Sequence, residues 1–103
     1  MTEMPGTDEP VDMARLSATI YGRVQGVYFR HFVRSMARKR GLTGYVRNLA
    51  GGNAVEVQAE GGRPQLEDLL EQLSIGPPGA RVRDVEASWA EYSGQFADFS
   101  VKH

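Results

Sequence analysis

The residues best suited to chemistry lie in one short run, residues 22–30, which reads GRVQGVYFR. Gly22 and Gly26 have no Cβ atom, so the backbone around them can turn sharply and approach a ligand closely. Successive backbone N–H groups in such a turn can point at one spot and bind an anion. Arg30 adds a fixed positive charge whose planar fork suits phosphate or carboxylate oxygens. The run therefore predicts a binding loop for a small phosphorylated ligand.

A purely structural role for this run is the alternative. The run matches neither GxxxxGK[ST] nor GxGxxG, so the loops of nucleoside triphosphatases and of dinucleotide-binding proteins are not indicated. Gly22 and Gly26 could simply shape a turn between a strand and a helix, and Arg30 could be a surface charge. The residue types and their spacing leave both interpretations open.

The segments on either side would position this run. Apolar and polar side chains alternate over residues 16–21, which predicts a strand. Apolar side chains then recur at helical spacing over residues 28–40, and Gly41 is placed as the residue just after the helix. The start of that helix would direct unsatisfied N–H groups and the positive end of its dipole toward the same anion.

Five further elements are indicated in the remainder of the chain. Two strand-like runs flank a glycine-rich turn at residues 49–53, which predicts a hairpin. Pro64 stands where the first turn of a helix tolerates proline. The apolar stripe of that helix consists of Leu66, Leu69, Leu70 and Leu73. Alternation predicts another strand at residues 85–89 and a short final one at residues 99–101.

The expected order is strand, helix, strand, strand, helix, strand, with a short addition at the end. Two helices that each have one apolar face need one face of a sheet to cover. We therefore expect an α+β, ferredoxin-like βαββαβ two-layer sandwich, with an antiparallel sheet and both helices on one face. This domain should span residues 13–103. Residues 1–12 carry four acids and no apolar periodicity, so we expect a flexible tail there.

Composition narrows the function classes. The chain has 103 residues, a net charge of −1 and no cysteine. A single domain without disulfides or thiolate chemistry is expected, which fits a cytoplasmic protein. No apolar run approaches the ~20 residues that span a bilayer, and the first residues do not resemble a signal peptide. The charge argues against a surface devoted to nucleic acid, and nothing in the sequence demands more than a monomer.

The two polar motifs resemble those of a known family. GRVQGVYFR is similar to the acylphosphatase signature: a glycine, x-Val-Gln-Gly-Val, a variable position, an aromatic residue and an arginine. GYVRN, at residues 44–48, resembles the family's other signature, which ends in an asparagine. The similarity covers residues 14–103. Between Asn48 and Val55 the chain has one residue more than the usual family pattern, so a longer hairpin turn is expected.

The resemblance implies an activity and a set of site residues. Acylphosphatases hydrolyse acyl phosphates to a carboxylate and inorganic phosphate, without a metal or a cofactor. By match, the phosphate-binding residues are Gln25, Gly26, Val27, Tyr28, Phe29 and Arg30. The resemblance also implies two catalytic residues: Arg30, which would bind phosphate oxygens, and Asn48, which would orient the attacking water. A small-molecule acyl phosphate is the expected partner, and phosphorylated aspartates are chemically eligible as well.

Other polar residues near the motifs are expected to have structural roles. His31 could be a nucleophile or a base, but a partly exposed helix position is the expectation, and neither histidine has a metal-ligand partner at helical spacing. Basic side chains at the end of the same helix favour a solvated face over an RNA surface. Strand alternation places Arg47 on the opposite face from Asn48.

Two other functions share this plan of elements. An RNA-recognition domain needs exposed aromatic residues on two central strands, and here only Tyr21 or Tyr45 is a candidate. A non-catalytic regulator cannot be distinguished by fold, although the presence of both Arg30 and Asn48 argues against it. The sequence leaves the physiological acyl phosphate open.

Overall fold

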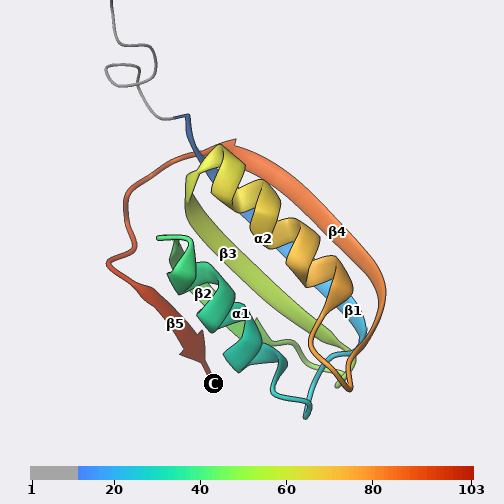
Figure 1. The fold of residues 1–103 in the computed structure, drawn as a ribbon. Coiled ribbons are helices and arrows are strands. Elements are labelled where there is room, and N and C mark those ends of the chain that lie inside the picture. The colour runs from blue at the N-terminus through green and yellow to red at the C-terminus, as the bar shows by residue number, and fades with distance from the viewer. Residues whose placement is uncertain (1–11) are drawn as a thin grey trace, which may run out of the picture.

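The computed structural model describes residues 12–103 and confirms the ferredoxin-like plan. The elements are β1 (Met13–Arg23), α1 (Phe29–Lys39), β2 (Thr43–Asn48), β3 (Ala54–Gly62), α2 (Arg63–Ile75), β4 (Arg81–Glu91) and β5 (Phe99–Lys102). Both helices lie against the same face of the sheet (Figure 1). The predicted tail lies outside the described residues except for Asp12, whose backbone carbonyl accepts a hydrogen bond of 2.7 Å from the Arg63 amide.

The sheet has the strand order β4-β1-β3-β2-β5. The first four strands pair antiparallel, as expected, but β5 pairs parallel to β2, so the sheet as a whole is mixed. The physical reason is the path of the chain after β4. Residues 92–98 cross from one edge of the sheet to the other, reverse direction and deliver β5 to the free edge of β2 (Figure 1).

The core lies between the sheet and the two helices. Alternate residues of β1 are buried, and three residues on each helix face them, as the apolar periodicity predicts. Each large apolar side chain buried in this way contributes about 1.5–3 kcal/mol to stability. Phe32 and Met36 belong to the apolar stripe of the same helix, but they are only half-buried and pack against the margin of the core.

The ends of the helices follow from local backbone chemistry. α1 begins at Phe29 because Tyr28 has a left-handed backbone, with φ 60°, and cannot belong to the helix. Gly41, with φ 70°, follows the helix as predicted. Pro64 lies in the first turn of α2, where its missing N–H is no loss.

A buried acid fixes the segment that leads to β5. Glu60 is 0% exposed, and its carboxylate accepts hydrogen bonds from the Ser93 amide, the Ser93 hydroxyl and the Gly94 amide at 3.0, 2.6 and 2.9 Å. Arg15 lies 3.6 Å away. Burial by itself raises the pKa of Glu60, but the Ser93 and Gly94 hydrogen bonds and the Arg15 charge hold it below its usual value. The crossing segment is therefore anchored to β3.

Candidate active site

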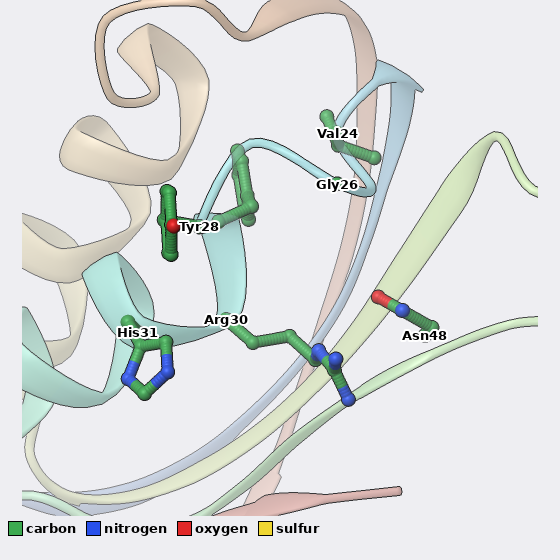
Figure 2. A pocket seen from close by; sticks show the side chains of 7 residues that line it. Val24, Gly26, Tyr28, Arg30, His31 and Asn48 are labelled. Carbon is green, nitrogen blue, oxygen red and sulfur yellow. The ribbon is translucent and has the colours of Figure 1, made fainter.

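One cavity, of about 290 Å³, brings the two sequence motifs together. It lies between the loop of residues 24–28, the first turn of α1 and the end of β2 (Figure 2). Its lining residues are Val24, Gly26, Tyr28, Phe29, Arg30, His31 and Asn48. Arg30 and Asn48, which are 18 positions apart in the sequence, thus line one pocket.

The two glycines of the first motif serve different purposes. Gly22 has φ 133°, and a Cβ atom there would lie 2.1 Å from the Arg81 carbonyl oxygen, so no side chain fits. Gly26 has φ 75° and open space around it. Only the backbone conformation demands glycine at residue 26, because an L side chain rarely adopts that φ. Gly22 lets two strands approach closely, and Gly26 lets the loop turn at the cavity.

Gln25 ties the loop to the hairpin that carries Asn48. Its Nε2 donates hydrogen bonds to the carbonyl oxygens of Leu49 and Ala54, at 2.9 and 2.8 Å. Leu49 and Ala54 also pair with each other through a backbone hydrogen bond of 3.0 Å. The Gln25 side chain therefore has a structural task and does not line the cavity. Val27 does not line it either; its side chain lies near the turn at Gly79.

The Arg30 side chain extends from α1 toward the end of β2 (Figure 2). One guanidinium nitrogen, Nη1, lies 3.2 Å from the Lys102 carbonyl oxygen, to which it donates, and 3.1 Å from His103 Nδ1. Neither a carbonyl oxygen nor an imidazole nitrogen carries a full negative charge, and within residues 12–103 Arg30 forms no ion pair. Its positive charge thus stays available to an anion, while β5 orients the side chain.

Asn48 is the last residue of β2 and pairs with Val55. Its Oδ1 is buried and has no hydrogen-bond partner within residues 12–103. Buried polar atoms are nearly always paired, so an unpaired one at a cavity wall is a candidate for a functional hydrogen bond. Arg47, one residue earlier, is exposed and pairs with Glu56. Strand alternation had placed it on the opposite face, and the structure agrees.

Tyr28 and His31 complete the outer wall of the cavity. Tyr28 is 81% exposed, and its ring centroid lies 6.3 Å from that of His31. A non-glycine residue in the left-handed region costs about 1–2 kcal/mol, and such strain is concentrated at functional sites. His31 is exposed, as expected, and its Nδ1 lies 3.3 Å from Arg34 Nη2. Its position in the cavity wall was not anticipated, because helical periodicity marks only which side faces the core.

The structure also bears on two broader expectations. No cluster of three or more histidine, cysteine or acidic side chains that could hold a metal ion occurs in the described part of the chain. Over the same residues, neither helix is long and apolar enough to span a membrane.

Comparison with known proteins identifies the family. The sequence model for Acylphosphatase matches residues 16–101. The chain is 50% identical over 88 residues to an acylphosphatase of Dehalococcoides mccartyi, covering 85% of this chain and 97% of that protein. It is 46% identical over 91 residues to one of Pyrobaculum aerophilum, covering 88% and 96% of the two. The structure of an acylphosphatase from Coxiella burnetii superposes with a TM-score of 0.83 at 37% identity, covering 88% of this chain and 94% of that one. The chain therefore belongs to the acylphosphatase family.

Proposed function

We propose that the chain hydrolyses acyl phosphates in the cavity between the 24–28 loop and the end of β2. The loop amides of Gln25 to Arg30 and the Arg30 guanidinium bind the phosphoryl group, and Asn48 orients the attacking water. The observation that carries this proposal is the juxtaposition of Arg30 with Asn48 in one cavity, where Asn48 Oδ1 has no partner among the described residues 12–103. Family membership supports the reaction class.

The chemistry explains why so few groups suffice. An acyl phosphate is a mixed anhydride, and its leaving group is a stable carboxylate that needs no protonation. What remains is to hold the phosphoryl group, place the water in line and stabilise the charge on the equatorial oxygens. Backbone N–H groups and an arginine hold the phosphoryl group and stabilise the charge on its equatorial oxygens. An amide oxygen that accepts a hydrogen bond from the water places that water in line.

The reaction then proceeds by a single displacement. The water oxygen forms a bond to phosphorus, and the bond between phosphorus and the acyl oxygen breaks. The carboxylate leaves with that electron pair, and a water proton passes to a phosphoryl oxygen of the substrate. Asn48 cannot act as a base, since an amide does not take up protons at neutral pH, so its role is orientation.

Hydrolysis of benzoyl phosphate in the presence of EDTA tests this proposal. Phenyl phosphate serves as the comparison, because its phenolate is a much poorer leaving group and the cavity wall offers no carboxylic acid to protonate it. We expect turnover of benzoyl phosphate that is unchanged by the chelator, with little or none of the monoester. Activity that disappears with EDTA and returns with a divalent metal would contradict the metal-free mechanism. Equal turnover of both substrates would contradict the assigned leaving-group chemistry.

A further inference from the structure

A second cavity, of about 490 Å³ and more open than the first, lies where the end of β1 meets the start of β4. Its lining residues are Arg23, Gly79, Ala80 and Arg81. It shares none of them with the cavity that Arg30 and Asn48 line. The glycine and the alanine contribute almost no side chain, so the wall between the two arginines is largely backbone. This cavity is therefore open to a small ligand and has two positive charges at its margin.

The two arginines are direct neighbours in the sheet. Arg23 and Arg81 are Cα partners in the antiparallel ladder of β1 and β4, and both are exposed. Like charges directly opposite each other on paired strands destabilise a sheet. The chain thus accepts a local electrostatic cost at this point, which a bound anion would remove.

The backbone prevents the arginines from separating. The ladder shifts register between Tyr21 and Gly22, and the two strands approach closely where Gly22 meets the Arg81 carbonyl group. On the other side, the Ala80 amide donates a hydrogen bond of 3.1 Å to the Pro77 carbonyl oxygen and closes the turn that leads into β4. The two side chains consequently start from fixed positions.

Neither arginine has a recorded acidic partner within residues 12–103. Five other arginines in this range form ion pairs with a glutamate or an aspartate: Arg15, Arg38, Arg40, Arg47 and Arg63. The nearest acid along β4, Asp84, accepts a hydrogen bond of 2.9 Å from the Val85 amide. Half of the ten arginines are thus neutralised by ion pairs, whereas this adjacent pair has no counter-charge among residues 12–103.

We propose that Arg23 and Arg81 form a second anion site, which binds a phosphate-sized oxyanion carrying two negative charges. Two guanidinium forks supply enough N–H donors to hold a tetrahedral dianion from two sides, and their combined charge matches it. Inorganic phosphate and the phosphoryl group of a small phosphomonoester share this chemistry. The turn at Gly79 and the Val27 side chain lie close together, so the second site borders the back of the 24–28 loop.

Titration of the full chain with inorganic phosphate, followed by amide chemical shifts, tests this assignment. We expect two separate groups of saturable shifts, one within residues 25–30 and one within residues 22–23 and 79–81. The double variant Arg23→Gln/Arg81→Gln should weaken binding at the second group at least about tenfold, since hydrogen bonds to charged groups are lost. The first group should titrate as in the wild type.

Arg83→Gln is the matched control, because Arg83 is an exposed arginine on the same strand that does not line the cavity. It should leave both groups of shifts unchanged. A parallel titration with glycerol phosphate distinguishes free phosphate from a phosphoryl group on a larger molecule. The assignment is overturned if residues 79–81 show no saturable shift, if the double variant binds like the wild type, or if Arg83→Gln weakens binding equally. Absence of shifts at residues 25–30 alone would contradict the proposed catalytic site and leave this second site intact.

Discussion

Glu60 and Asn48 lie at opposite ends of the pair formed by β2 and β3, and they meet the cost of burying polar atoms in opposite ways. Glu60 pairs with Thr43 at one end of the ladder, and its carboxylate accepts three hydrogen bonds within the protein. Asn48 pairs with Val55 at the other end, and its Oδ1 has no recorded partner within residues 12–103. One end of the hairpin is thus fully satisfied, and the other keeps an acceptor free at a cavity.

The difference shows how one hairpin serves both stability and chemistry. A satisfied buried acid fixes the crossing segment and, through it, the strand β5 whose end contacts Arg30. An unsatisfied amide is costly to stability but remains available to a ligand or a water. If this division is correct, substitutions at the cavity end should change turnover and leave the fold intact. Substitutions at the Glu60 end should lower the stability of the fold and leave turnover per folded molecule nearly unchanged.

Arg30→Lys should give the largest effect. Lysine keeps the charge but replaces the planar fork with a single point donor, so it cannot hold two phosphoryl oxygens at once. We expect kcat/KM for benzoyl phosphate to fall by roughly 10³, with losses in both phosphate affinity and turnover. Arg34→Lys, one turn along α1 and outside the cavity lining, is the control. Wild-type kinetics for Arg30→Lys would mean that Arg30 is only a surface charge.

Asn48→Ala should reduce kcat by roughly 10², about 2.7 kcal/mol, because it removes an interaction needed mainly at the transition state. Inhibition by inorganic phosphate should hardly change, since the loop amides and Arg30 remain. Asn53→Ala, in the same hairpin turn but away from the cavity, serves as the matched variant. If Asn48 only caps the turn, the Asn48→Ala protein will be less stable yet turn over normally per folded molecule. Urea unfolding and kinetics on one preparation distinguish these results.

Glu60→Gln should change stability rather than chemistry. The neutral amide weakens three hydrogen bonds to a buried carboxylate, so we expect a loss of about 2 kcal/mol in the free energy of unfolding at pH 7. Glu56→Gln, on the same face of β3, should cost much less because the Glu56–Arg47 pair is partly exposed. Turnover per folded molecule should stay close to that of the wild type. A selective loss of kcat without loss of stability would contradict the assigned anchoring role.

The pH dependence of unfolding tests the same contribution of Glu60 to stability. The pKa of Glu60 is lower in the folded protein than its usual 4.5, so its carboxylate stabilises the fold above pH 4.5. That contribution is lost as the pH falls from 4.5 through the lower, folded pKa. Urea unfolding across this range should therefore show a shallower decline for Glu60→Gln than for the wild type. Parallel curves for the two proteins would show that Glu60 does not contribute to acid sensitivity.

The smallest expected effect concerns Tyr28. Tyr28→Gly should relieve the left-handed backbone and raise the free energy of unfolding by about 1 kcal/mol relative to Tyr28→Ala, in which the strain persists. Because the wild-type side chain is 81% exposed, little packing is lost in either variant. Equal stability of the two variants in urea would show that residue 28 is not strained.

Most of the secondary-structure elements were predictable because apolar periodicity, proline and glycine reflect local backbone preferences. Apolar alternation located β1, and leucine spacing and Pro64 located α2. Gly26 marked a sharp turn, where its φ is 75°. The start of α1 was set one residue early, since periodicity includes Tyr28 but cannot show its left-handed backbone. A hairpin turn at residues 49–53 was also predicted, and these residues do lie between β2 and β3.

The sequence by itself determined the type of each element, the order of the elements and the residue types available for phosphate chemistry. Only the tertiary structure decided which distant groups meet. Gln25 bonds to Leu49 and Ala54, Arg30 contacts Lys102 and His103, and Glu60 accepts from Ser93. The parallel pairing of β5 with β2 was likewise decided only by the tertiary structure. Periodicity reports how each segment faces the core, whereas these contacts join segments tens of residues apart and depend on how the packed layers bring them together.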